Sequence, residues 1–512
     1  MKRISTTLFR IAALLALVAI PASLKADDGA WSVRTEGVAT VATGDNAPFW
    51  LTANRHGLST AEPASGYLRA GIFKSYTRTK GFDYALGADL AAAYHHAAPV
   101  RLQQCYADVR YGCWQLSVGS KERGPQGKNA ALSSGGLLWS GNATPIPQVR
   151  FGIEDYTEVP FWFNGWAHVK GFLSYGTYTD GRWQQSFVDS HVGGRYTLHT
   201  LLHEKAAFLK IAKPSVTPIA LELGLEMDSQ FGGDCYEIQP DGTALLWLAN
   251  PHGAKDFAKA LIPMAGGGDA AASDQQNIAG NQIGSWHAAV SYQGTEWSVR
   301  AYAEHLFEDK SGMIPFGRPV GADGRHHLML VYPWRDGLLG AEATLPRNPF
   351  VSHVVAEYVT TVDQGGALHH MRTDGVPYSV GGADNYYYHS SFQSWHHGGM
   401  AMGTPFALSP IYNADGNLYM MHTRLRAFHL GFDGQPAATL AYRVKASAFR
   451  SLGTYIDPVA TQRQFSALGE LTWMPAQLSG WQGTLSLAFD RGDLTGHSVG
   501  TMLSVQKIFR LP

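Results

Sequence analysis

Cysteine is scarce in this sequence, with three residues in a chain of 512. A small and odd number argues against a scaffold held together by disulfides. Cys105 and Cys113 flank a predicted tight turn but are out of register with each other, so we expect no disulfide between them.

The sequence also lacks an excess of either charge, with 40 Lys and Arg residues against 41 Asp and Glu residues. This balance gives no reason to expect a nucleic acid as partner. Long apolar runs are missing as well. After residue 26, no stretch approaches the roughly 18 apolar residues of a membrane-spanning helix.

The first 26 residues have the pattern of a secretory signal. Lys2, Arg3 and Arg10 precede an apolar run over residues 11–20, and small residues follow up to Ala26. The run is too short to span a membrane as a helix. We predict a signal peptide over 1–26, cleaved near Ala26, followed by one exported barrel domain over 27–512.

Glycine and aromatic residues are plentiful, and apolar residues alternate with polar ones in segment after segment. In residues 481–489, Trp481, Leu485, Leu487 and Phe489 occupy the odd positions, while the even positions are polar or small. Successive side chains of a strand point to opposite faces, so such a segment has one apolar and one polar face. Together with export, the repeated alternation indicates an outer-membrane β-barrel.

The alternating segments number eighteen. They are predicted at 31–43, 66–78, 82–93, 101–110, 114–120, 147–157, 167–178, 204–212, 219–231, 283–292, 297–307, 335–345, 350–363, 418–431, 437–449, 463–473, 481–490 and 498–509. An even number suits a closed barrel whose two ends lie on one side of the membrane.

The lengths of the connections support this count. If the last strand runs towards the periplasm, every second connection is periplasmic, and these are all short, as at 79–81, 293–296 and 474–480. The other set includes the long connections 121–146 and 364–417. Short periplasmic turns and long external loops are typical of such barrels. The predicted fold class is therefore all-β, a transmembrane antiparallel barrel of about 18 strands with long extracellular loops.

Side chains at special positions fit the same fold. Five tryptophans lie beside predicted periplasmic turns, as an aromatic girdle requires. They are Trp114, Trp166, Trp297, Trp473 and Trp481. Lys507 lies on the lipid-facing side near a strand end, where its ammonium group can reach the interface. Charged residues on the inner side, such as Glu222, Glu226 and Asp228, require water or one another inside the barrel.

Two motifs with possible chemistry have simpler explanations. Gly496–Gly500 matches G-x-S-x-G, but Ser498 opens a predicted strand with no helix after it, so the nucleophile elbow is missing. Four His-His pairs occur, at His95, His326, His369 and His396 with their successors, and adjacent residues of an extended chain point in opposite directions. We interpret these as polar loop histidines and predict neither a catalytic residue, nor a metal, nor another cofactor. A divalent ion gathered from several loops is the alternative for the histidines.

Two other loop features bear on function. Residues 254–261 can form two helical turns, and we expect them to pack as a lid on the rim of the barrel. The loop 364–417 is rich in aromatic residues and nearly free of charge. Exposed aromatic rings beside amide, hydroxyl and imidazole groups suit the CH-rich face and the hydroxyls of a sugar.

We predict polysaccharide contacts from this loop and from residues 132–144. The candidates are Tyr386, Tyr387, Tyr388, Trp395, His396, His397, Trp139 and Asn142. The alternative is that these aromatic residues pack the loop onto the mouth of the barrel. We expect shallow sites on a rim formed by 364–417 with 121–146 and 44–65, and no deep pocket.

Four separated segments resemble the capsule assembly Wzi family in its Bacteroidetes-type branch. They are Ala47–Leu58, residues 132–153, Glu304–Met313 and Gly403–Asn413. The resemblance implies an outer-membrane barrel of about eighteen strands that holds capsular polysaccharide at the cell surface, as a lectin without catalysis. The periplasmic helical plug of the enterobacterial members has no clear counterpart in the few residues before Trp31.

We expect the protein to lie in the outer membrane, with its lipid as a partner. Three classes of function are then considered. The leading hypothesis is a non-enzymatic protein that binds capsular or other surface polysaccharide and helps to assemble or attach the capsule. The alternative is a diffusion pore for sugars or small solutes, which the charged inner side favours. An outer-membrane enzyme is the third class, and no nucleophile and base are recognisable in the sequence.

Overall fold

A computed structural model describes most of the chain after residue 30. The described ranges are 31–78, 81–159, 163–189, 191–271, 274, 278–308, 312–317, 324–325, 327–330, 334–365, 368–373, 376–381 and 384–511. The predicted signal peptide lies outside these ranges.

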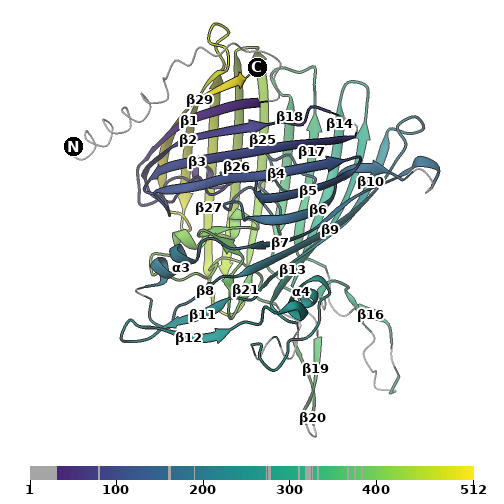
Figure 1. The fold of residues 1–512 in the computed structure, drawn as a ribbon, viewed down its shortest axis with the longest axis vertical. Coiled ribbons are helices and arrows are strands. Elements are labelled where there is room, and N and C mark those ends of the chain that lie inside the picture. The colour runs from purple at the N-terminus through teal and green to yellow at the C-terminus, as the bar shows by residue number, and fades with distance from the viewer. Residues whose placement is uncertain are drawn as a thin grey trace.

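Eighteen antiparallel strands form one sheet that closes on itself (Figure 1). They are β1 (Trp31–Ala42), β2 (Ala64–Lys74), β3 (Phe82–Tyr94), β4 (Val100–Tyr111), β5 (Trp114–Ser120), β6 (Gln148–Glu158), β7 (Ala167–Thr177), β9 (Leu201–Ala212), β10 (Ile219–Phe231), β13 (Asn281–Gln293), β14 (Ser298–Glu308), β17 (Gly337–Thr344), β18 (His353–Thr360), β25 (Leu425–Ala437), β26 (Leu440–Gly453), β27 (Pro458–Trp473), β28 (Trp481–Gly492) and β29 (Ser498–Leu511). The first and last strands pair from Trp31 with Leu511 to Ala42 with Gly500, which closes the barrel. The predicted transmembrane barrel and its number of strands are confirmed.

Smaller elements belong to the connections. They are α2 (Phe49–Thr52), η1 (Phe163–Gly165), α3 (Gly181–Val188), β8 (Arg195–Leu198), β11 (Asp234–Ile238), β12 (Ala244–Ala249), α4 (Ala254–Leu261), β15 (Phe316–Gly317), β16 (Met329–Leu330), β19 (Leu368–Thr373), β20 (Val376–Gly381), β21 (Tyr388–His389), β22 (Gln393–Ser394), β23 (His396–His397), β24 (Met400–Ala401), η2 (Pro405–Ala407) and η3 (Pro410–Tyr412). No helix in the described ranges is long and apolar enough to cross a membrane.

One predicted boundary is wrong. The segment 418–431 begins as a strand only at Leu425 and continues to Ala437, with an irregularity between Gly434 and Ala437. The turn expected at 432–436 is therefore shorter and lies at residues 438–439. Leu418 and Met420 are apolar because they are buried in a loop, which period-2 alternation alone could not distinguish from a strand.

The alternation has the expected consequence in three dimensions. Leu485 and Leu487 of β28 are exposed on the outer face, whereas Ser486, Ala488 and Asp490 are buried on the inner face. Lys507 donates a hydrogen bond from Nζ to the Ser479 carbonyl oxygen (2.7 Å), beside the short turn. The lysine thus lies at the interface rather than in the middle of the lipid.

The predicted helix at 254–261 is confirmed as α4. It packs at the rim, as expected, but against the outer wall rather than as a lid. The ring of Phe257 packs against Tyr175 of β7 and Phe231 of β10. Phe231 lies an even number of residues after Leu221 and Leu223 in β10, so it is on the same face of the strand. Those two leucines are exposed on the outer wall. The helix therefore lies against the outside of the barrel at its rim.

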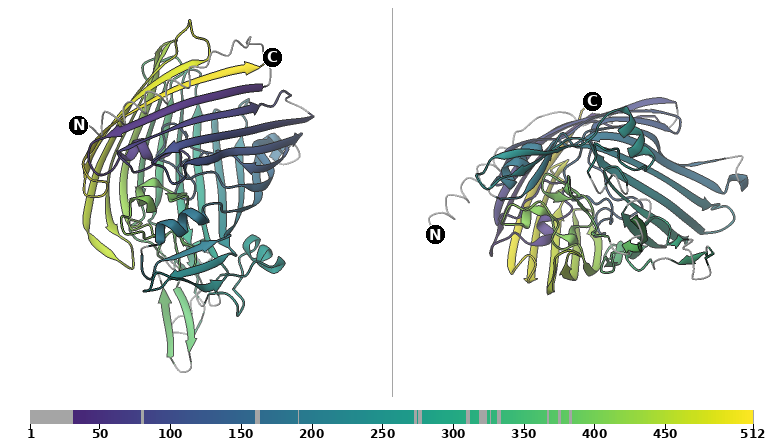
Figure 2. Two further views of the ribbon diagram at one scale, coloured as in Figure 1. Left: turned by 60° about the vertical axis from the view of Figure 1, so that its left-hand side comes forward. Right: turned by 90° about the horizontal axis from the view of Figure 1, so that it is seen from below.

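The long connections enter the barrel and fill it. One apolar core joins Trp50 of α2, Leu137 and Leu138, Trp395 and Phe406 to inner-wall side chains. Figure 2 shows the corresponding ribbons inside the ring of strands when the molecule is viewed from below. Outside the barrel, at the end away from the C-terminus, β8, β11 and β12 form a separate small sheet, and β19 and β20 form a hairpin (Figure 1).

Candidate functional site

The residues predicted to contact polysaccharide lie mostly inside the barrel. Tyr386, Tyr387, Trp395, His396, His397 and Asn142 are buried, while Tyr388 and Trp139 are partly exposed. The expectation of exposed aromatic rings is wrong for the buried residues, because inner-wall groups satisfy the polar atoms of their loop. The structure shows the alternative considered above, in which they pack the loop into the mouth.

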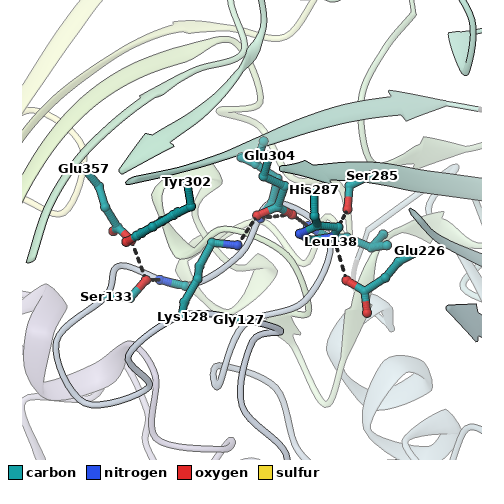
Figure 3. Close-up of polar contacts among 12 residues, drawn as sticks. Gly127, Lys128, Ser133, Leu138, Glu226, Ser285, His287, Tyr302, Glu304 and Glu357 are labelled. Carbon is teal, nitrogen blue, oxygen red and sulfur yellow. Dashed lines mark hydrogen bonds and ion pairs between the residues drawn. The ribbon is translucent and has the colours of Figure 1, made fainter. Parts of the chain in front are cut away.

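The segment 129–142 is held by carboxylates of the barrel wall, and Glu357 of β18 is the first (Figure 3). Its Oε1 accepts hydrogen bonds from the hydroxyls of Ser133 and Tyr302, both at 2.6 Å. Its Oε2 accepts a bond from the Ser134 backbone N–H at 2.7 Å. A single buried carboxylate thus fixes two consecutive loop residues.

Glu304 of β14 is the second carboxylate. Its Oε1 accepts the backbone N–H groups of Leu137 (2.8 Å) and Leu138 (3.1 Å). Its Oε2 lies 2.5 Å from Nζ of Lys128, and both side chains are almost fully buried. The loop therefore supplies both a cation and two backbone donors to one wall charge. Figure 3 shows this pair next to His287 of β13, which bonds to Glu226 of β10 at 2.9 Å.

The aromatic part of the loop 384–424 rests on segment 129–142. Trp395 donates from Nε1 to the Leu138 carbonyl oxygen (2.9 Å). The Tyr387 hydroxyl donates to the Leu137 carbonyl oxygen (2.7 Å). The rings of Trp139 and Trp395 meet edge to face, with centroids 5.7 Å apart. Trp139 in turn donates from Nε1 to Asp228 of β10 at 2.5 Å.

Asn142 joins three loops. Its Oδ1 accepts the Asn54 backbone N–H (3.1 Å), and its Nδ2 donates to the Ala401 carbonyl oxygen (3.0 Å) and to the Ser409 hydroxyl (3.2 Å). The predicted meeting of 44–65, 121–146 and 364–417 is therefore confirmed. The meeting occurs inside the barrel, however, and not as an exposed rim of aromatic rings.

Loop 43–63 is fixed on β26 and β28 of the barrel wall. The Phe49 backbone N–H donates to Asp490 of β28 at 2.8 Å, and Trp50 Nε1 donates to Ser447 of β26 at 3.2 Å. The Phe49 ring stacks on Phe406 with centroids 5.7 Å apart. The sequence analysis found inner-wall acids on β10 but did not single out Glu304, Glu357 or Asp490. Their positions in the alternating pattern, on the inward-facing side of predicted strands, could have identified them.

His397 has a hydrogen-bond partner in a neighbouring loop, and His396 lies buried beside Asp180. Nδ1 of His397 lies 2.9 Å from the Thr144 carbonyl oxygen. Burial lowers the pKa of His396 to about 4, and the carboxylate of Asp180, 3.8 Å away, opposes this only in part. His396 is therefore neutral at pH 7. The described residues contain no group of three or more His, Cys, Asp or Glu side chains arranged to hold a metal.

Other aromatic side chains remain accessible on the outer loops. Trp247 of β12 is 39% exposed, and the guanidinium of Arg195 lies 3.8 Å from its ring centroid. Arg195 also donates to Glu237 at 2.6 Å. The rings of Tyr388 and Tyr419, both partly exposed, are 5.0 Å apart. Their loop packs on the same small sheet, since Leu418 shares an apolar cluster with Tyr196 of β8 and Ile238 of β11. We call Arg195, Glu237, Trp247, Tyr388 and Tyr419 the outer aromatic cluster.

The sequence analysis identified only Tyr388 of this cluster. Arg195, Glu237 and Trp247 come from β8, β11 and β12, which were not predicted as strands. The signal that could have found them is the apolar run Ala244–Ala249 within a long external loop. Cys235 of β11 is buried beneath this sheet, and all three cysteines are free, as expected for Cys105 and Cys113.

Ser498 opens β29, and no helix follows it, as predicted. Its side chain is buried on the inner wall. The strand-to-helix elbow that would expose a nucleophile is therefore missing at this motif.

Comparison with solved structures supports the fold. No model of a known protein family matches this chain, and no curated protein matches it. The structure is similar to that of Wzi from Escherichia coli, described as an outer-membrane, carbohydrate-binding β-barrel involved in group 1 capsule assembly. The TM-score is 0.52 at 12% identity, over 93% of this chain and 83% of Wzi.

Other solved structures match with lower scores. OccK5 of Pseudomonas aeruginosa matches with a TM-score of 0.45 at 10% identity, over 94% of this chain and 97% of OccK5. OccAB2 of Acinetobacter baumannii matches with a TM-score of 0.45 at 8% identity, over 94% and 98%. At these identities the likeness to Wzi shows the fold alone, so the chain has a Wzi-like barrel of the outer-membrane type.

Proposed function

We propose that this protein is a non-enzymatic outer-membrane protein that binds capsular or other surface polysaccharide and helps to assemble or attach the capsule. One observation carries the proposal. The external loops form an apolar core inside the barrel, while Trp247, Tyr388 and Tyr419 stay partly accessible on the small outer sheet and on the loop that packs against it. The Wzi-like fold and the sequence resemblance to the Wzi family support the same function.

The contact residues that we propose are Trp247, Tyr388 and Tyr419. Aromatic faces suit the CH-rich face of a sugar ring, and Arg195 and Glu237 supply hydrogen-bonding groups beside them. Of the eight residues predicted from sequence, Tyr388 is retained as a contact. The other seven shape the loops that present the cluster.

A flat cluster is compatible with function because the ligand is a polymer. A single millimolar contact corresponds to about −4 kcal/mol. Many copies of the protein that engage one long chain gain through effective concentration, so each site can be shallow.

The alternative, a diffusion pore, is disfavoured by the same observation. The inner-wall acids that favoured a pore have partners within the protein: Asp228 accepts a hydrogen bond from Trp139 Nε1, Glu226 lies 2.9 Å from His287, and Glu222 lies 3.2 Å from Arg300. Glu304, Glu357 and Asp490 accept N–H groups of the loops. These contacts weaken the argument for a charged, open channel.

The test compares Trp247→Ala and Tyr388→Ala with Tyr455→Ala. Tyr455 is an exposed aromatic residue of the loop between β26 and β27, and the guanidinium of Arg424 lies 5.9 Å from its ring centroid. Purified protein is applied to a glycan array that includes capsular polysaccharide, and capsule retention is measured on cells. We expect both cluster variants to lose binding and retention while the Tyr455 variant keeps them. Equal behaviour of all three variants would reject the cluster as the contact surface.

A further inference from the structure

A polar cavity of about 480 Å³ lies inside the barrel at the end that carries the short turns. Besides Glu470 and Met502, three neighbouring strands, β27, β28 and β29, supply six uncharged hydrogen-bonding side chains to its wall. These are Thr472, Gln482, Thr484, Ser486, Ser504 and Gln506. The volume falls within the range of roughly 300–1,000 Å³ that is typical of small-molecule sites.

The amide groups of this wall are available to a ligand. Gln482 and Gln506 are directly opposite each other on β28 and β29, and both are partly exposed. The hydroxyls beside them are also close together, with Thr472 and Thr484 at 3.1 Å. Amide and hydroxyl groups both donate and accept hydrogen bonds, which matches the hydroxyls of a sugar.

The charged groups at the cavity contact other groups of the protein. Glu470 lies between two guanidinium groups, at 3.0 Å from Arg55 and at 2.5 Å from Nε of Arg443. Across the cavity, His353 lies 2.7 Å from Asp433. Glu36, which also lines the cavity, accepts a hydrogen bond from the Ser504 hydroxyl at 3.1 Å and lies 4.0 Å from Arg69. The charged groups of the lining thus have neighbours within the protein, whereas the amides are partly exposed, which favours a neutral polar ligand.

Arg55 reaches this cavity from the loop that follows α2, and its placement involves backbone strain. Asn54 and His56, on either side of it, have φ values of 56° and 52°, in the left-handed region that L-residues seldom adopt. Such conformations cost energy and cluster at functional sites. The two strained residues therefore flank the arginine that lines the cavity.

We propose that this cavity is a carbohydrate site, distinct from the outer aromatic cluster, that takes a short neutral oligosaccharide at the end of the barrel with the short turns. The amides of Gln482 and Gln506 bond to the sugar hydroxyls. Tyr67 of β2 contributes an aromatic side chain to the wall. The site does not rest on the function proposed for the outer surface, because the filled mouth of the barrel lies between them.

The experiment is isothermal titration calorimetry on the full-length protein in detergent, with maltotriose, cellotriose and chitotriose as probes. We expect saturable binding of at least one probe with a Kd of about 1 mM or below. The double variant Gln482→Leu, Gln506→Leu should bind at least about tenfold more weakly, since it loses two pairs of hydrogen-bonding groups.

Two controls separate this site from the outer cluster and from loss of folding. Gln115→Leu changes an inner-wall glutamine of β5 that does not line the cavity, and Trp247→Ala changes the outer cluster. Both should bind the trisaccharides as the unaltered protein does, and heat-modifiable migration on gels verifies that each barrel is folded. Absence of saturable binding by all three probes, or unchanged binding by a folded double variant, would overturn the proposal.

Discussion

Two sets of aromatic residues in the external loops differ in their exposure to solvent. Tyr386, Tyr387 and Trp395 are buried inside the barrel, whereas Trp247 and Tyr455 remain exposed. In the buried set, the Tyr387 backbone N–H donates to the carboxylate of Glu308 in β14 at 2.7 Å. Tyr387 and Trp395 also rest on the segment that Glu304 holds through two backbone N–H groups. In the exposed set, Trp247 and Tyr455 lie beside the guanidinium groups of Arg195 and Arg424 instead. What separates an inward loop from an outward one is therefore the polar side chain opposite it, and four changes test this comparison.

The largest effect is expected for Glu304→Gln. The variant leaves the buried Lys128 ammonium without its counter-charge and weakens the bonds from two backbone N–H groups. Breaking a buried ion pair in this way costs about 3–5 kcal/mol. We expect the loops to leave the barrel part of the time, seen as single-channel current in planar bilayers where the unaltered protein gives little. Glu296→Gln, at an exposed turn, is the control, and equal currents from both would contradict the role of Glu304.

Acidification should loosen the same loops. The pKa of His396 is lowered to about 4 from an ordinary value of 6.5, so the unfolded state binds more protons between these two values. Stability is therefore full above pH 6.5 and falls as the pH drops towards 4, by up to about 3 kcal/mol for this one group. His422, lowered by burial to about 4, acts in the same direction.

Urea unfolding followed by tryptophan fluorescence at pH 7 and pH 5 measures this dependence. His396→Gln should make the free energy of unfolding less dependent on pH, because up to one proton fewer is taken up on unfolding. An unchanged pH dependence in this variant would show that His396 is protonated as easily in the folded protein as in the unfolded chain.

A smaller loss is expected for Asn142→Ala. The change removes the acceptor for the Asn54 N–H and the donor to the Ala401 carbonyl oxygen, and leaves buried groups unsatisfied. Each such group costs about 1–3 kcal/mol, so urea unfolding should report a loss of roughly 2 kcal/mol. Asn142→Asp should be worse, since an oxygen would then face the Ala401 carbonyl. If Asn142→Ala is as stable as the unaltered protein, the three loops are held together elsewhere.

The smallest effect on stability is expected for Trp247→Ala. The side chain is partly exposed on an edge strand, and substitutions away from core contacts usually change stability by less than about 0.5 kcal/mol. Trp395→Ala, the buried counterpart, should cost about 3–5 kcal/mol in the same urea titration. Similar losses for the two tryptophans would erase the distinction between inward and outward loops.

The strands of the barrel were largely predictable because the membrane imposes a local rule. A strand with lipid on one side and polar contacts on the other must alternate, and every such segment carries the pattern within its own residues. The long loops obey no such rule. Leu418 and Met420 resembled a strand although they are buried in a loop, and Ala244–Ala249 formed an unpredicted edge strand.

Side-chain alternation and connection length, which are local properties, were enough to predict the barrel, its eighteen strands, the direction of each strand and the separation of short turns from long loops. The placement of the loops inside the barrel, the burial of Trp395 and Asn142, and the position of Trp247 and Tyr419 on the outer surface became visible in the folded chain alone. The physical reason is that a loop's position depends on partners such as Glu304 and Asp490, which are distant in the chain and become neighbours only when the barrel closes.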